Sequence, residues 1–102
     1  MIHVIAIITA KPGMRAQILD AFHANMPAVH AEKGCIEYGP ATDAPDIGPF
    51  QTKFGPDTFV VIEKWETPAA LQAHAASSHM AAYGAKTRDM IASRIIHVLA
   101  PA

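Results

Sequence analysis

The chain has 102 residues, of which 51% are hydrophobic and only 17% charged, with a net charge of -1. This length predicts one domain over residues 1–102. The absence of a lysine and arginine cluster excludes the charge pattern of a nucleic-acid-binding protein. The single cysteine, Cys35, excludes an internal disulfide and favours a reducing cytoplasm. The apolar start, MIHVIAIITAKPG, is too short to span a membrane and lacks the features of a signal peptide.

The first third of the chain predicts a strand followed by a helix. Residues 2–9 are rich in β-branched side chains and end at a Lys-Pro-Gly turn. Residues 14–30 carry apolar residues every three or four positions, which is helical spacing; these are Met14, Ile18, Phe22, Met26 and Val29. Pro27 should kink this helix or start a new turn, because it lacks an N–H. Gly34 is expected to end the segment.

The remainder predicts three strands and a divided helix. Residues 35–40 form a short strand, and residues 40–58, with four prolines, form a long loop with one extended piece around 50–54. Residues 59–66 alternate as the strongest strand. Thr67 and Pro68 then begin a helix that runs to about residue 76. Ser77-Ser78 should break it, so that a second helix covers residues 79–91, and residues 95–99 form the last strand.

This order, βαββαβ, predicts an α+β ferredoxin-like fold, with one antiparallel sheet and both helices on the same side. The other face of the sheet then has no cover from within the chain. Since the strands are apolar on both faces and the chain is low in charge, we expect a homodimer packed sheet to sheet.

The histidines do not predict a metal site. His74 and His79 are five residues apart, which on one continuous helix separates them by about 140° around the axis. A break at Ser77-Ser78 could bring them together, but no carboxylate or cysteine lies nearby in sequence to complete a ligand shell. No glycine-rich phosphate loop or nucleophile elbow is present. We therefore expect no metal and no cofactor, and a structural role for Cys35.

An aromatic-binding pocket is the alternative to an ordinary core for residues 63–83. Glu63 and Trp65 share one face of a strand, and His79 and Tyr83 share one face of a helix. If the two faces meet, ring surfaces and a few polar groups would suit a flat aromatic ligand. A tryptophan at a strand end is more often part of a core than of a pocket, so spacing alone leaves both interpretations open.

Three segments, GCIEYGP, FQTKFGPDTFVVIEKWE and AALQAHAASSHMAAY, resemble the antibiotic-biosynthesis monooxygenase superfamily, and within it the small bacterial quinol monooxygenases. The resemblance covers nearly the whole chain. It implies a dimeric α+β barrel, in which two ferredoxin-like subunits pack sheet to sheet. It also implies oxygenation of quinol-like or polyphenolic aromatics by O₂ without metal, flavin or haem.

The resemblance also assigns site residues. Trp65 becomes a pocket wall, and His79 and Tyr83 become candidate catalytic groups. His79 is preferred as the base because histidine titrates nearest to neutral pH, with His74 as the second candidate; spacing does not rank the two. Glu63 would hold a histidine or close a subunit contact.

Three other functions are alternatives to quinol oxidation. Haem-degrading relatives carry an Asn on the first strand, which IHVIAIIT lacks, and a haem-ligating His near the position of Tyr83. Isomerases of small phosphorylated signalling molecules would need cations in the pocket, and only the distant Arg88 or Arg94 could supply them. A non-catalytic quinone-binding or stress-response dimer is the third alternative.

Overall fold

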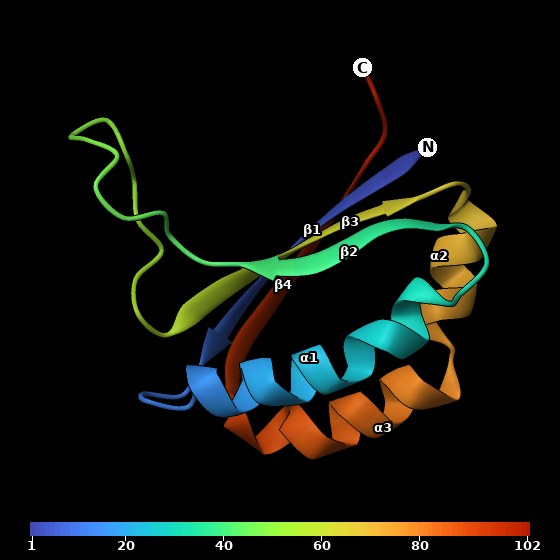
Figure 1. The fold of residues 1–102 in the computed structure, drawn as a ribbon, viewed down its shortest axis with the longest axis horizontal. Coiled ribbons are helices and arrows are strands. Elements are labelled where there is room, and N and C mark those ends of the chain that lie inside the picture. The colour runs from blue at the N-terminus through green and yellow to red at the C-terminus, as the bar shows by residue number, and fades with distance from the viewer.

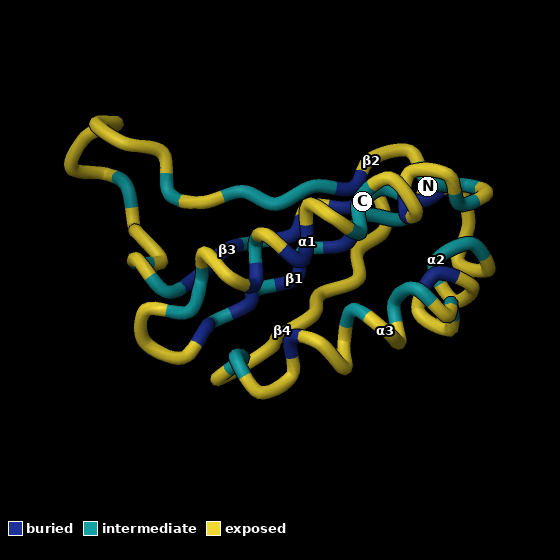
Figure 2. Tube along the Cα trace, turned by 60° about the horizontal axis from the view of Figure 1, so that its bottom comes forward, coloured by how far each residue is buried: buried dark blue, intermediate teal, exposed yellow.

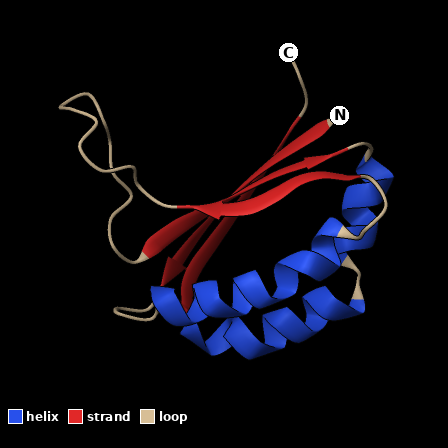
Figure 3. Cartoon of the chain, viewed as in Figure 1, coloured by secondary structure: helices blue, strands red, loops and turns tan.

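The computed structural model describes all residues, 1–102. One sheet has the order β2-β3-β1-β4 with every neighbouring pair antiparallel, and the helices lie together on one of its faces (Figures 1 and 3). This confirms the α+β, ferredoxin-like fold. The elements in chain order are β1 (Ile2–Ala10), α1 (Arg15–His30), β2 (Cys35–Ala41), β3 (Thr58–Trp65), α2 (Pro68–Ala75), α3 (Ser78–Thr87), the 3₁₀ turn η1 (Arg88–Met90) and β4 (Ile91–Leu99).

The core lies between α1 and the helix-facing side of the sheet. Alternate residues of β1 and β3 are buried there, as their period of two requires. Phe22 of α1 stacks on Tyr38 of β2 with ring centroids 5.0 Å apart and planes at 8°. Phe22 also meets Phe59 edge to face at 6.0 Å. These aromatic contacts fix α1 across β2 and β3 and leave β4 outside the packed part of the core.

The break between α2 and α3 is confirmed, and both helices begin with a side-chain cap. The Thr67 hydroxyl accepts a hydrogen bond from the N–H of Ala70 at 3.1 Å, and the Ser77 hydroxyl accepts one from Met80 at 3.3 Å. Each cap satisfies an N–H that has no partner within the first turn of its helix. The Ser77 cap therefore starts a new helix where the preceding one stops.

The first helix runs to His30 as predicted, and Pro27 lies inside it. Two later boundary predictions were wrong. The last strand begins at Ile91 instead of residue 95, and α3 ends at Thr87. Residues 91–94 lack a continuous apolar pattern, but they pair with the far end of β1 after a register shift at Thr9 and Ala10. Pairing with the neighbouring strand thus decides a boundary that side-chain type alone does not.

The long loop between β2 and β3 projects from the body of the molecule (Figures 1 and 2). It contains no strand, so the extended piece expected around residues 50–54 is absent. Both oxygens of Asp43 brace it by accepting hydrogen bonds from the N–H groups of Phe54 and Gly55, at 2.9 and 2.8 Å. Phe50, near the middle of the loop in sequence, is 82% exposed. The loop therefore exposes the apolar side chain of Phe50, while the hydrogen bonds of Asp43 hold the loop in shape.

The face of the sheet opposite the helices is apolar and uncovered. Ile62 and the β4 residues Ile95 and Leu99 are exposed there. Figure 2 shows β4 exposed along almost its whole length. None of the helices combines the length and the apolar character needed to cross a membrane.

Candidate functional site

A cavity of about 720 Å³ lies between the helix-facing side of the sheet and the helices α2 and α3. Of its 21 lining residues, 15 are hydrophobic, so it suits a mainly apolar ligand of small-molecule size. Its wall also includes a small set of groups that can bind or ionise: Tyr38, Glu63, His74, Tyr83, Thr87, Arg88 and Arg94.

Glu63 and Trp65 come from the buried face of β3. The indole N–H of Trp65 donates a hydrogen bond to Oε1 of Glu63 at 2.9 Å. Burial raises the pKa of the Glu63 carboxyl, and the Trp65 hydrogen bond and the nearby His74 oppose that rise. Trp65 is fully buried and does not line the cavity. It contributes to the site indirectly, by holding Glu63 and by packing against His74.

His74 occupies the last turn of α2 and lines the cavity. Its ring lies on Trp65, with centroids 4.7 Å apart, and meets Tyr38 at 5.3 Å. Its Nδ1 is 2.8 Å from Oε2 of Glu32. Because a carboxylate only accepts hydrogen bonds, Nδ1 is the donor, and in the neutral imidazole Nε2 then keeps a lone pair. Aromatic packing and one carboxylate thus fix both the orientation and the tautomer of a buried imidazole.

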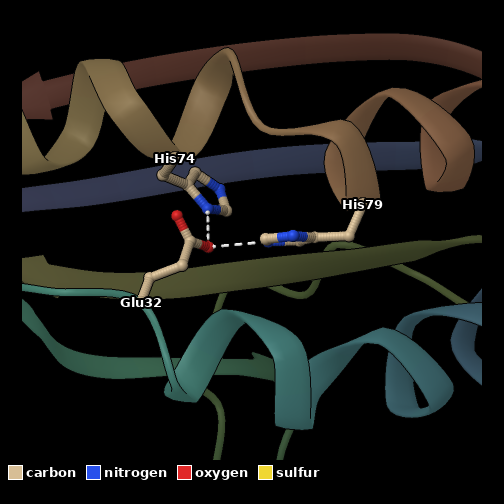
Figure 4. A group of neighbouring side chains, drawn as sticks. All are labelled: Glu32, His74 and His79. Atoms are coloured by element: carbon tan, nitrogen blue, oxygen red, sulfur yellow. Dashed lines mark hydrogen bonds and ion pairs between the residues drawn. The ribbon is translucent and has the colours of Figure 1, made fainter.

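His79 lies in the first turn of α3, on the other side of Glu32. Its Nε2 is 3.0 Å from the same Oε2 atom and 3.2 Å from the Ser77 hydroxyl. Figure 4 shows both imidazole rings directed at this one oxygen. His79 does not line the cavity. Of the two histidines that spacing could not rank, His74 is the one on the cavity wall.

Tyr83 lines the cavity from α3 and packs edge to face on Phe22, with centroids 5.9 Å apart. Burial raises the pKa of its phenol to about 12, although the positive charge of Arg94 opposes the rise. The phenol therefore stays protonated near neutral pH. Tyr83 can donate a hydrogen bond to a ligand oxygen, but it is poorly suited to accept a proton.

The structure therefore joins Glu63, His74 and Tyr83 on one cavity wall and leaves Trp65 and His79 behind it. Sequence spacing missed Glu32, because this residue lies 42 positions before His74. No carboxylate completes the pair of histidines from nearby in sequence, but the fold brings Glu32 to both of them. The one sequence feature that could have pointed to Glu32 is its position as an acidic residue just after α1, where the chain turns toward β2.

The sequence pattern also placed Arg88 and Arg94 too far from the pocket. Arg88, in η1, and Arg94, in β4, both line the cavity. The predicted last strand began after Arg94, which left this residue without a position in the sheet. Once β4 pairs with β1, Arg94 lies opposite Ile8 and on the helix-facing side. The cavity wall thus carries two cations from residues that are far from His74 in sequence.

Known proteins are similar to this chain in sequence and in fold. Residues 1–86 match the family model described as antibiotic biosynthesis monooxygenase. A relative from Escherichia coli (strain K12), described as probable quinol monooxygenase YgiN, is 38% identical over 103 residues, covering 99% of this chain and 98% of the relative. The structure of PA3566 from Pseudomonas aeruginosa is 26% identical with a TM-score of 0.80, covering 99% of this chain and 93% of that one. Rv0793 from Mycobacterium tuberculosis is 24% identical, also with a TM-score of 0.80, covering 99% and 94%. The chain therefore belongs to the antibiotic biosynthesis monooxygenase family.

Proposed function

We propose that this protein is a monooxygenase that oxidises small quinols with O₂ and needs no cofactor. The observation that carries the proposal is His74, a buried imidazole on the wall of a mainly apolar cavity whose Nδ1–H is held by Glu32. The name of the E. coli relative, a probable quinol monooxygenase, supports the same substrate class. The cavity volume of about 720 Å³ falls within the range of about 300–1,000 Å³ that is typical of small-molecule sites.

His74 is the proposed general base, in preference to His79. Its Nε2 would take the proton of a quinol hydroxyl, and Glu32 would stabilise the resulting imidazolium through Nδ1. Tyr83 would donate a hydrogen bond to the substrate oxygen. The charge of Arg94, which already lowers the pKa of Tyr83, would favour the anionic quinolate. An electron-rich quinolate in a dry cavity is a good one-electron donor to O₂, so the protein has little other chemistry to supply.

The reaction balances without an added reductant. The quinolate gives one electron to O₂, and the two radicals combine to form a C–O bond at a free ring carbon beside the oxygen-bearing carbon. His74 returns its proton to the peroxide. The ring hydrogen at that carbon and the outer oxygen then leave as part of one water molecule. A quinol and O₂ thus give a hydroxyquinone and water, and the quinol supplies all four electrons that O₂ accepts.

O₂ consumption with a reduced naphthoquinone tests this proposal, using metal-stripped protein and a control without protein. Replacing the base, His74→Gln, should lower the rate by a factor on the order of 100 to 10,000. His23→Gln, on the exposed side of α1, is the matched control and should leave the rate unchanged. A rate no higher than the control without protein, for a panel of quinols, would contradict the proposed activity. Quenching of Trp65 fluorescence by quinones without turnover would favour a non-catalytic quinone-binding protein.

A second candidate is the isomerisation of a small phosphorylated molecule, and Arg88 and Arg94 on the cavity wall are the observation that favours it. A phosphate group would require both cations. Arg88→Gln should then abolish binding of a phosphorylated ligand and have little effect on the oxidation of an uncharged quinol. Equal loss of quinol turnover would favour the monooxygenase alone.

We also propose that the protein acts as a homodimer, with the uncovered faces of the two sheets in contact. Exposed apolar residues on that face, including Ile62 and Ile95, support the proposal. The exposed Phe50 on the projecting loop would add to the contact between subunits. The cavity lies on the opposite side of each sheet, so every subunit would hold its own substrate and O₂.

A further inference from the structure

Glu32, His74 and His79 form a compact group, called here the Glu-His-His cluster. Glu32 comes from the turn after α1, and the two histidines come from the last turn of α2 and the first turn of α3. One potential metal-binding atom from each residue lies within 4.8 Å of the others. Figure 4 shows the carboxylate placed between the two rings. Three separate segments of the chain are thus joined at one carboxylate oxygen.

The distances within the Glu-His-His cluster are close to those of a metal site. Nitrogen and oxygen ligands bind zinc tetrahedrally at about 2.0–2.2 Å, so neighbouring ligand atoms lie about 3.3–3.6 Å apart. The two oxygen–nitrogen distances here, 2.8 and 3.0 Å, are slightly shorter than this. Since no pair of these atoms exceeds 4.8 Å, the widest pair would need to close by at most about 1.5 Å. Small rotations of side chains, without a change of fold, would accommodate an ion.

The chemistry and burial of the Glu-His-His cluster also suit a divalent cation. Two imidazoles and one carboxylate are borderline ligands of the kind that zinc prefers. The side chain of Glu32 is 13% exposed, and its ion-pair partners are the two histidines, with no lysine or arginine among them. A cation would balance this negative charge. The ring of His79 is 28% exposed, which leaves a route for the ion and room for a water ligand.

We propose that Glu32, His74 and His79 bind a divalent first-row cation, with Zn²⁺ as the ion that fits best. The ligand atoms are one oxygen of Glu32, Nδ1 of His74 and Nε2 of His79. The Ser77 hydroxyl, 3.2 Å from Nε2 of His79, can hydrogen-bond to a water that completes the coordination. Spacing along a continuous helix hides this site, because the break at Ser77 turns His79 back toward His74.

Binding of the cation has a consequence for His74, which rests on the proposed function. With Nδ1 bound to metal, the neutral imidazole must carry its proton on Nε2. That nitrogen then donates a hydrogen bond and no longer accepts a proton from the quinol. An occupied site therefore inhibits oxidation, so the cation acts as a regulator and takes no part in the reaction.

Binding is measured first, on the metal-stripped full chain, by competition between the protein and a chromophoric zinc indicator. We expect one Zn²⁺ per chain. Glu32→Gln and His79→Ala should each weaken binding at least tenfold, because even outer partners of metal ligands contribute about 10–100-fold. His23→Ala removes an exposed histidine and Cys35→Ser removes the thiol, and both should keep the wild-type affinity.

Circular dichroism shows whether each variant is folded. If Glu32→Gln does not fold, the more exposed His79→Ala decides the result. Wild-type protein that binds no zinc, or zinc affinity that is unchanged in a folded His79→Ala variant, would overturn the site. Affinity lost in Cys35→Ser but kept in His79→Ala would assign the zinc to the thiol and would equally overturn it.

Inhibition is measured second, as O₂ uptake with a reduced naphthoquinone in zinc buffers, each variant being compared with its own rate without zinc. Zinc at concentrations that fill the site should suppress most of the wild-type rate and leave that of His79→Ala unaffected. Full activity of the zinc-loaded wild type would overturn the link to His74. No turnover under any condition would reject the proposed function but leave the binding result intact, so the two failures are distinguishable.

Discussion

At the scale of single residues, Glu63 has a carboxyl group whose charged form the fold does not favour. Its side chain is buried, and burial raises the pKa of its carboxyl above the usual value near 4.5. The ionisable groups that influence its pKa are His74, Glu32 and Arg94. A carboxyl whose pKa is higher in the folded than in the unfolded state stabilises the fold below pH 4.5, and that stabilisation is lost as pH rises through the folded pKa.

Glu63→Gln should therefore stabilise the protein at neutral pH. Glutamine keeps an oxygen that can accept the Trp65 hydrogen bond but removes the buried charge. The free energy of unfolding of the variant, relative to wild type, should increase with pH from about 4.5 and level off above the folded pKa. Each tenfold difference in proton affinity between the two states contributes about 1.4 kcal/mol. Urea unfolding of both proteins across pH 4–8 measures this, and a difference that does not vary with pH would contradict it.

At the scale of elements, the turn between α1 and β2 fits closely against α2. Gly34 has a positive φ of 85°, and a Cβ atom at this position would lie 2.7 Å from Cβ of Ala70. Only glycine adopts this backbone conformation without strain and allows α2 so near. Because Glu32 lies two residues earlier, the same close approach brings its carboxylate to His74.

Gly34→Ala should be more destabilising than Gly13→Ala, its matched control. Gly13 also has a positive φ, 77°, but an added Cβ would meet nothing within 4 Å. We expect Gly13→Ala to cost about 1–2 kcal/mol of strain and Gly34→Ala a further 1–3 kcal/mol or so from overpacking. Thermal and urea unfolding measure both. Equal losses would show that α2 can move away from the turn without cost.

The helix break at Ser77 gives a second prediction at this scale. Ser77→Ala and Thr67→Ala each remove one helix cap, so each should lower stability by about 1 kcal/mol. Ser77 also donates a hydrogen bond to the carbonyl of His74 at 2.8 Å and lies beside His79, whereas Thr67 contacts neither histidine. Zinc affinity should therefore fall in Ser77→Ala and stay constant in Thr67→Ala, as measured with the same indicator. If Ser77→Ala and Thr67→Ala change zinc affinity equally, the Ser77 cap does not support the Glu-His-His cluster, and this prediction is contradicted.

At the scale of the whole molecule, the sequence predicted the fold more completely than the site. Strand alternation in residues 59–66 and the two capping residues, Thr67 and Ser77, are local signals, and local signals place elements well. The cluster around Glu32 depends on how the turn after α1 lies against α2 and α3, which no spacing along the chain specifies. Arg94 was missed because the first residues of β4 are in the strand only through their pairing with β1, which the sequence pattern does not show. The site is a product of tertiary packing, and single-chain periodicity does not contain that information.

The proposed dimer gives a test with two neighbouring residues of β4. Ile95 and Ile96 are about equally exposed, at 51% and 46%, but they lie on opposite faces of the sheet. Ile95→Lys should convert the dimer into a monomer, because an unpaired ammonium buried between sheets is strongly unfavourable. Ile96→Lys should leave the dimer intact and weaken quinone binding in the cavity. Light scattering after size exclusion gives the mass, and Trp65 quenching gives the binding. A dimeric Ile95→Lys variant would contradict the proposed interface.

The last strand also has a consequence for how this protein can change. Arg94, Ile96 and Val98 line the cavity, while the residues between them point away from it. An insertion or deletion that shifts the register of β4 against β1 by one residue would turn its side chains to the opposite face. Arg94 would then leave the cavity, and the apolar outer face would lose Ile95 and Leu99. Under the proposed function and the proposed dimer, this strand couples the choice of substrate to the contact between subunits. New substrates would then be reached by substitution at alternate positions and not by a change in strand length.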